Sequence, residues 1–343
     1  MSRGPRRGST RGPALTARGG LGGLVLGLLF VAAAILAFLY AGPGPRAPQG
    51  PATTVVLEHG RGVPGIARAL KRAGVIRSRL AFIAMAKLTA GGGSLKAGEY
   101  AVRSGESMAS ILGDLKAGRV VRHFVTIPEG WTSEMAANAV NASPVLTGLA
   151  PVPPEGAILP ETYEVRRGDD RGKVMARMEQ ARDKLLDQLW AHRAPGLPFS
   201  SPEEAVTLAS IVEKETGVPS ERPRVAAVFE NRLKAGMRLE SDPTVIYGVS
   251  KGVPLGRGLT ESELAGASPY NTYKITGLPP TPIANPGRAA LTAVLDPPQT
   301  DELYFVADGT GGHVFSSTFE QHQRNVARWR QIERARAPEA QAK

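Results

Sequence analysis

The chain has 343 residues, enough for about two domains, and it contains no cysteine. The absence of cysteine excludes a disulfide framework, a thiolate zinc site, an iron–sulfur cluster and a cysteine nucleophile. Lysine and arginine (42) outnumber aspartate and glutamate (31), for a formal net charge of +11. No basic stripe interleaved with aromatic residues occurs, however, so we expect no nucleic-acid partner.

An uncharged segment near the N-terminus gives the first predicted element. Its apolar part, Leu24–Ala41, is long enough to cross the hydrocarbon layer of a bilayer as a helix. Five arginines and no acid precede it, so the positive-inside rule keeps the N-terminus in the cytoplasm and exports the rest. A signal peptide is the other interpretation. Because the segment is longer than a signal peptide's apolar part, and because Pro43 makes a poor cleavage site, we expect an uncleaved anchor in the cell (inner) membrane.

We therefore predict a cytoplasmic tail over residues 1–20, a transmembrane helix over 21–42 and a Pro/Gly-rich spacer over 43–52. The spacer is expected to hold the next domain off the bilayer. Residues 53–127 are predicted to form a small α+β module, in which the Gly91–Gly93 run ends the second helix. Its expected elements are a strand at 53–57, helices at 65–73 and 80–88, a strand within 95–102, a helix at 107–116 and a strand at 120–127.

The remaining residues, 128–343, are predicted to form a larger α+β domain. Ser201, Pro202 and the two acids after them are a typical helix start, and this helix is expected to reach about Thr216. Short strands and turns are expected to dominate between Gly236 and Val314. The other expected elements are helices at 174–189, from Ser220 to Gly236 and at 318–334, and a strand at 303–307.

Most catalytic sequence templates are absent from the chain. There is no GxSxG, GxxxxGK[ST] or HExxH motif, and no GxGxxG follows a strand. None of the five histidines is spaced three or four residues from another, so we expect no metal site, and no cofactor is predicted. His313 lies in a Gly-Gly-His turn and is a candidate for lining a cleft, although a structural role is the commoner one for such a residue.

Two acids near residue 216 are the candidates for acid–base chemistry. At about 100° per residue, Glu213 and Glu215 lie at opposite margins of an apolar stripe that includes Leu208 and Val212. Glu215 is nearer the helix C-terminus, whose partial negative charge disfavours a carboxylate, so burial and this field would both raise its pKa. A solvated charge cluster at a helix end is the competing interpretation.

Four longer motifs follow one another in a distinctive order: LASIVEKETG, SERPRVAAVFENRLKAGMRLESDPTVIYG, SPYNTYKITGLPPTPIANPG and LYFVADGTGGHVFS. In their order and spacing they resemble the endolytic murein transglycosylase (YceG-like) family, from about Thr54 to the C-terminal helix. The upstream segment LKAGEYAVRSGESMASIL resembles a LysM module. Together they imply a LysM-like module over 53–127, expected to bind glycan without cutting it, and a YceG-like catalytic domain over 128–343.

The resemblance implies cleavage of the MurNAc–GlcNAc bond within peptidoglycan glycan strands, which leaves 1,6-anhydro-MurNAc ends and would terminate strand elongation. The family's essential acid is the second glutamate of its EKE, here Glu215. The resemblance also implies peptidoglycan synthases of the elongation or division machinery as partners. Polar and aromatic residues of turn-rich loops, together with Glu213, are the candidate substrate contacts: Glu213, Asp242, Tyr247, Tyr270, Asn271, Thr272, Tyr273, Asn285 and His313.

One carboxyl can suffice if the sugar's own C6 hydroxyl is the nucleophile, whereas a hydrolase needs two. Two other functions therefore stay open. One is a non-catalytic peptidoglycan-binding scaffold. The other is a hydrolytic muramidase, whose second carboxyl would be Asp242, Glu240 or Glu213.

Overall fold

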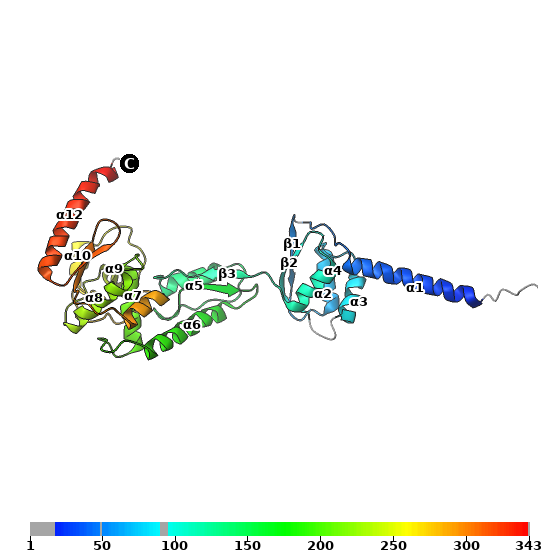
Figure 1. The fold of residues 1–343 in the computed structure, drawn as a ribbon, viewed down its shortest axis with the longest axis horizontal. Helices are drawn as coiled ribbons and strands as arrows, with labels where there is room; N and C mark the ends of the chain where they lie inside the picture. The colour runs from blue at the N-terminus through cyan, green and yellow to red at the C-terminus, as the bar shows by residue number, and fades with distance from the viewer. Residues whose placement is uncertain (1–17, 49, 90–94, 342–343) are drawn as a thin grey trace, which may run out of the picture. The chain divides into compact units, whose positions relative to one another are not determined.

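The computed structural model describes residues 18–48, 50–89 and 95–341, which form two compact units divided between Val121 and Arg122 (Figure 1). Most of the predicted cytoplasmic tail and the Gly91–Gly93 run lie outside the described residues. The first helix is α1 (Arg18–Ala41). Within the described ranges, Gly23–Ala41 is the one helix long and apolar enough to cross a membrane, a criterion that a signal sequence also meets.

The first unit contains one antiparallel strand pair and three short helices beside α1. In the strand pair, Val55 lies opposite Tyr100, and the buried residues of the first strand alternate with exposed ones. The core contains Leu70, Phe82 and Leu112. These elements confirm five of the predicted ones to within a few residues: β1 (Ala52–Leu57), α2 (Val63–Arg72), α3 (Arg79–Thr89), β2 (Gly98–Arg103) and α4 (Met108–Ala117).

The predicted spacer after α1 is hydrogen-bonded to the first unit, so it is no free linker. The Gly44 N–H donates to the Gly105 carbonyl (3.0 Å), and the Gly105 N–H donates to the Pro45 carbonyl (2.9 Å). The Arg77 guanidinium donates to the Pro43 carbonyl (3.3 Å). These contacts fold the segment onto the unit through the loop after β2, and the expected distance of the unit from the bilayer stays a prediction.

The predicted strand at 120–127 belongs to the second unit. β3 (His123–Thr126) pairs antiparallel with β4 (Thr162–Val165), with Val125 opposite Tyr163. Its assignment to the small module over 53–127 is therefore wrong. The alternation of apolar residues indicated a strand correctly, but it could not indicate the partner, which lies about 40 residues further along the chain.

The second unit contains two hydrophobic cores. One lies between β3, β4, α5 and the first half of α6; the other joins the end of α6 to α7, α8 and α11. An antiparallel pair of β5 and β6 packs against α12. The remaining elements are α5 (Ser133–Ala142), α6 (Arg171–Ala191), α7 (Pro202–Glu215), α8 (Arg222–Lys234), α9 (Asp242–Ser250), α10 (Glu261–Ala265), α11 (Arg288–Leu295), β5 (Tyr304–Ala307), β6 (His313–Ser316) and α12 (Phe319–Gln341).

Helix α7 begins as its sequence predicts. The Ser201 hydroxyl accepts the Glu204 N–H (3.2 Å), and the Glu204 carboxylate accepts the Ser201 N–H (3.1 Å), which completes a capping box. Every residue from Ala205 to Val212 is buried. The helix ends at Glu215, and the extended backbone of Thr216 turns the chain away, so the second acid of the EKE occupies the last helical position.

The segment from Gly236 to Val314 is more helical than predicted, since it contains α9, α10 and α11. The β-branched residues of DPTVIYG favour a strand locally. In the structure Ser241 instead occupies the N-cap position of α9, Pro243 lies in its first turn, and Val245 and Tyr247 are buried. Tertiary packing here outweighs local β propensity. Helix α5 was not among the predicted elements.

Candidate functional site

A cleft of about 440 Å³ forms in the second unit where several distant segments meet. Its walls come from the ends of α7 and α8, the turn before α9, the start of α9, the loop at Tyr273, β5 and α12. Two of the predicted site residues beside Glu215, Asp242 and Tyr273, lie here. The lining residues are Glu215, Arg232, Leu239, Glu240, Asp242, Tyr273, Phe305, Val306 and His322.

Glu215 is the most strongly perturbed acid of the cleft. Its pKa is raised to about 7, chiefly by burial and also by the nearby charge of Asp242. A hydrogen bond from the Ser241 hydroxyl to Oε1 and the charges of His313 and Arg232 act in the opposite direction. The side chain nonetheless remains partly exposed in the cleft. At neutral pH both the protonated and the ionised form are therefore populated, as acid–base catalysis requires.

The hydroxyl that contacts Glu215 is held in place by a buried network. The Ser241 N–H donates to Thr272 Oγ1 (2.9 Å), and Thr244 Oγ1 donates to the Ser241 carbonyl (2.7 Å). The two threonine hydroxyls also lie 2.8 Å apart. All three residues are buried. Thr272, a predicted substrate contact, thus supports Ser241 in the structure and does not line the cleft.

Asp242 and Tyr273 form a second polar pair in the cleft. The Tyr273 hydroxyl donates to Asp242 Oδ1 (2.7 Å). Burial raises the pKa of Tyr273, and the hydrogen bond to Asp242 raises it further, so the phenol keeps its proton. One oxygen of Asp242 is thereby engaged. Its negative charge beside Glu215 favours the protonated form of the glutamate.

Arg232 fixes the turn that carries Glu240. Its guanidinium donates to the Leu239 carbonyl (3.1 Å), to Glu240 Oε2 (3.1 Å) and, through Nε, to the Leu303 carbonyl (2.7 Å). Glu240 has a φ of 55°, a left-handed conformation that costs a residue other than glycine about 1–3 kcal/mol. The arginine contacts offset this strain, which places Ser241 and Asp242 at the cleft.

Glu213 occupies a different environment from Glu215. Its Oε2 accepts the Gly287 N–H at the start of α11 (2.9 Å), and its Oε1 lies 3.3 Å from the Arg222 guanidinium. Burial raises the pKa of Glu213, while both of these partners lower it. The residue is not among those that line the cleft. Its observed contacts join α7 to α8 and α11, so its role as a substrate contact stays a prediction.

The two predicted asparagines are fully buried and satisfy backbone groups. Asn271 Oδ1 accepts the Tyr273 N–H (3.0 Å), which positions the tyrosine of the cleft. Asn285 Oδ1 accepts the Ile158 N–H (3.2 Å), and its Nδ2 donates to the Trp131 carbonyl (3.0 Å). Both residues therefore hold loops together, and neither lines the cleft.

Tyr247, Tyr270 and His313 also lie outside the lining of the cleft. The rings of Tyr247 and Tyr270 are 5.0 Å apart, and Tyr247 lines a separate, mainly apolar pocket of about 420 Å³. His313 Nδ1 lies 2.8 Å from Glu221 Oε2, and its ring meets Phe305 edge-on. His313 nevertheless acts on the cleft, because its charge lowers the pKa of Glu215.

Three polar residues of the site were not found from the sequence, Ser241, Arg232 and His322, and neither were the apolar lining residues Leu239, Phe305 and Val306. A usable signal existed for Ser241, because a serine directly before Asp-Pro is a typical helix N-cap. Arg232 carried no distinguishing pattern within its helix. His322 lines the cleft from α12, its ring stacks on Tyr304 with centroids 5.0 Å apart, and burial lowers its pKa.

The Ser241 contact predicts a shift in the pH dependence of any acid catalysis by Glu215. For a general acid with a pKa of about 7, kcat/KM is expected to fall tenfold per pH unit above about pH 7. Because the Ser241 hydrogen bond lowers the pKa of Glu215, Ser241→Ala should move this decline to higher pH. Initial rates between pH 5 and pH 9 would test it, and an unchanged profile would contradict the role of Ser241.

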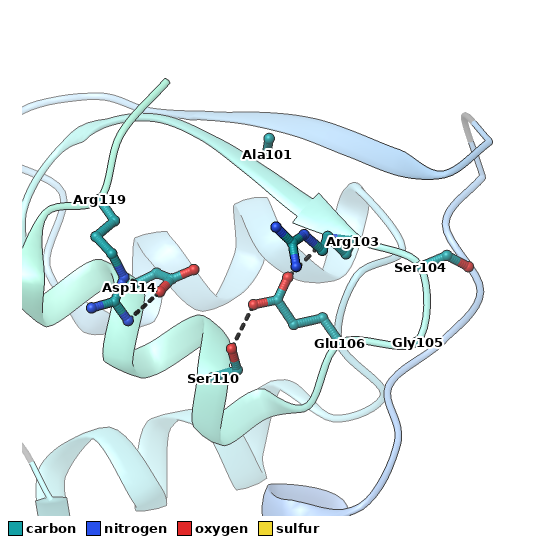
Figure 2. A pocket seen from close by; sticks show the side chains of 8 residues that line it. All are labelled: Ala101, Arg103, Ser104, Gly105, Glu106, Ser110, Asp114 and Arg119. Atoms are coloured by element: carbon teal, nitrogen blue, oxygen red, sulfur yellow. Dashed lines mark hydrogen bonds and ion pairs between the residues drawn. The ribbon is translucent and has the colours of Figure 1, made fainter. Parts of the chain in front are cut away.

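The first unit contains a polar pocket of about 520 Å³, shown in Figure 2. The Ser110 hydroxyl donates to Glu106 (2.7 Å), as does the Arg103 N–H (2.8 Å), and Arg119 donates to Asp114 (2.6 Å). Arg119 and Asp114 thus pair with each other, while Glu106 is held by a backbone N–H and a hydroxyl. Ser104, Gly105 and Glu106, in the loop between β2 and α4, lie in its wall. Glycan binding by this unit and its likeness to LysM stay predictions.

The chain is similar in sequence to proteins of two other bacteria. It is 30% identical over 324 residues to a Streptococcus pneumoniae protein named endolytic murein transglycosylase; the match covers 80% of this chain and 58% of that relative, so the chain spans little more than half of it. A Bacillus subtilis protein of the same name is 30% identical over 298 residues, which cover 77% of this chain and 81% of the relative.

A crystal structure of a YceG-like protein from Listeria monocytogenes is similar as well. It has a TM-score of 0.50 and 29% sequence identity, and the match covers 80% of this chain and 98% of that one. The YceG-like family matches residues 55–328, a span that includes the small unit's strands and the whole cleft up to α12. On this match and on the relatives above, the chain is a member of the YceG-like family.

Proposed function

We propose that this protein is an endolytic murein lytic transglycosylase with Glu215 as its single general acid and base. The observation that carries the proposal is the state of Glu215: a desolvated carboxyl with a pKa of about 7, partly exposed in a polar cleft and hydrogen-bonded by Ser241. The names of the relatives, which span S. pneumoniae and B. subtilis, support peptidoglycan as the substrate.

In the proposed reaction the protonated Glu215 delivers its proton to the oxygen that joins MurNAc C1 to the next GlcNAc. The C1–O bond breaks, and the released GlcNAc keeps that proton on its hydroxyl. The C6 hydroxyl oxygen of the same MurNAc then bonds to C1, and its proton passes to the Glu215 carboxylate. The product carries a 1,6-anhydro ring, no water is consumed, and the acid is regenerated.

Asp242 fits a supporting role in this reaction. Positive charge develops at the anomeric carbon in an oxocarbenium-like transition state. A carboxylate in the same cleft would stabilise that charge, while Tyr273 keeps one of its oxygens oriented. Its charge also favours the protonated form of Glu215 in the resting enzyme.

The proposed location follows from α1. Its apolar, exposed stretch would anchor the protein in the cell membrane, with the N-terminus in the cytoplasm and the cleft on the outer side, where peptidoglycan lies. An enzyme so placed would cut nascent strands and limit their length, in association with peptidoglycan synthases.

A hydrolytic muramidase is the second candidate, because the cleft contains further carboxyls. Asp242 and Glu240 both line it, whereas Glu213 is engaged by Gly287 and Arg222 outside it. In a hydrolase one of the two cleft acids would activate water or attack the sugar directly. A non-catalytic scaffold is the third possibility, and any turnover at all would eliminate it.

Product mass separates these functions. We expect the full-length protein, acting on uncrosslinked glycan strands, to release fragments that end in anhydro-MurNAc and are lighter by one water than hydrolytic products. Mass spectrometry of borohydride-treated digests measures this, because an anhydro end cannot be reduced. Reducible MurNAc ends would support the muramidase, and the absence of any cleavage would support the scaffold.

A further inference from the structure

Helix α3 of the first unit presents an exposed apolar stripe. Leu80 and Leu88 are 73% and 76% exposed, and Ala84 lies between them at the same four-residue spacing. On a helix this spacing places the three side chains on one face. The opposite face carries Phe82 and Met85 into the core. The stripe therefore faces outward and does not contribute to the core of the first unit.

Helix α3, which carries the stripe, contacts the apolar helix α1. Leu36, Leu39 and Tyr40, in the last turns of α1, pack against the core of the first unit, and α1 contacts both α3 and α4 (Figure 1). The segment after α1 is hydrogen-bonded to the same unit through Gly44. Helices α1 and α3 therefore belong to one packed unit.

The charge of α3 complements one kind of surface. Its sequence, RLAFIAMAKLT, contains two basic residues and no acid. Arg79 and Lys87 are both exposed and lie near the ends of the apolar stripe. A helix with leucines on its outer face and basic residues at its ends is typical of a segment that lies in the headgroup region of an anionic bilayer.

We propose that α3 is an interfacial helix, whose Leu80, Ala84 and Leu88 insert into the bilayer that α1 spans. The occupant of this surface is an anionic lipid bilayer, because α3 contacts the apolar helix α1 and carries two basic residues and no acid. The small unit then lies directly on the membrane, and α3 adds a second membrane contact beside the transmembrane one. This inference rests on the proposed anchoring by α1.

The absence of cysteine permits a direct test with single-cysteine variants of the full chain. Leu80→Cys and Leu88→Cys would each carry an environment-sensitive fluorophore, in proteoliposomes of phosphatidylglycerol and phosphatidylethanolamine. Phe30→Cys, in the exposed middle of α1, is the lipid reference. Val56→Cys is the water reference, since Val56 is exposed on β1 on the side opposite its buried residues. Lipid-attached nitroxides then quench those probes that contact the acyl region.

We expect the probes at Leu80 and Leu88 to be quenched and blue-shifted like that at Phe30, while the Val56 probe is not. If the Phe30 probe is quenched but the Leu80 and Leu88 probes behave like the Val56 probe, the interfacial helix is overturned and the anchor is left intact. No quenching at Phe30 would overturn both. A blue shift without quenching, lost on dilution of protein in lipid, would show that a second copy covers the stripe and would overturn the proposal.

The charge contribution is tested separately. Arg79→Glu together with Lys87→Glu should reduce quenching of the Leu88 probe in phosphatidylglycerol vesicles and change it little in neutral phosphatidylcholine vesicles. The matched control is Arg61→Glu, on the loop between β1 and α2, which should have no effect on the same probe. If Arg61→Glu reduces the quenching of the Leu88 probe equally, the overall charge of the protein governs the signal. That result would overturn the role of the basic residues of α3.

Discussion

Glu215→Gln is expected to abolish measurable release of anhydro-MurNAc ends. Loss of general acid–base catalysis costs about 10²–10⁴-fold in rate, and more where no second carboxyl substitutes. Glutamine has nearly the shape of glutamate and can still accept the Ser241 hydrogen bond, but it has no proton to deliver. The variant should fold normally, and its thermal midpoint should equal or exceed that of the wild type, because a desolvated acid kept for chemistry lowers stability.

Glu213→Gln is the matched control, two residues earlier on the same helix. It removes the charge that pairs with Arg222, but its amide oxygen can still accept the Gly287 N–H. We therefore expect a lower thermal midpoint with most of the turnover retained. Rates and melting curves of both variants measure this contrast. A dead Glu213→Gln beside an active Glu215→Gln would reverse the assignment, and wild-type rates in both would exclude the mechanism.

Glu230→Gln is expected to raise the free energy of unfolding at pH 8. The Glu230 side chain is 1% exposed in α8, both of its oxygens lack a hydrogen-bond partner among the described residues, and Lys234 Nζ lies 3.9 Å away. Burial raises the pKa of Glu230 from 4.5 to about 8, although Lys234 lowers it. A buried, unsatisfied polar group costs about 1–3 kcal/mol, and an ionised one costs more. The amide removes the charge while keeping the shape.

The sign of the pH dependence follows from the two states. Between about pH 4.5 and pH 8 the folded protein keeps a proton on Glu230 that the unfolded chain releases, so this group makes stability fall as pH rises through that window. Glu230→Gln should thus gain about 1–3 kcal/mol over wild type at pH 8 and much less at pH 5. Urea unfolding at both pH values measures the difference. The exposed Glu333→Gln is the control, and an equal gain there would contradict the role of burial.

Local chemistry made several features predictable from the sequence. The length and apolarity of Leu24–Ala41 predicted a helix, and the capping serine and proline at Ser201 and Pro202 predicted where α7 begins. Helical periodicity then placed Glu213 and Glu215 at opposite margins of a buried stripe, and in the structure they contact different neighbours. Each of these features depends on residues close together in the chain.

The rest was decided by contacts between residues far apart. The strand at His123–Thr126 was recognisable, but its partner β4 was not. The alternation of apolar residues shows which face of a strand is buried, but it does not show which strand lies next to it. In the same way, Asp242 was a candidate from the sequence, but the hydrogen bond from the Ser241 hydroxyl to Glu215 was not. It forms only because α9 is helical and because Arg232 holds the turn at 238–240.

The sequence by itself therefore determined the apolar helix and the helix that carries Glu213 and Glu215. Only the tertiary structure decided which side chains surround Glu215, because desolvation, the chief cause of its raised pKa, and the Ser241 hydrogen bond, which lowers that pKa, are both properties of packing. It also decided that α3 contacts α1 and that the segment after α1 is hydrogen-bonded to the first unit, because these backbone groups find partners that are distant in the sequence.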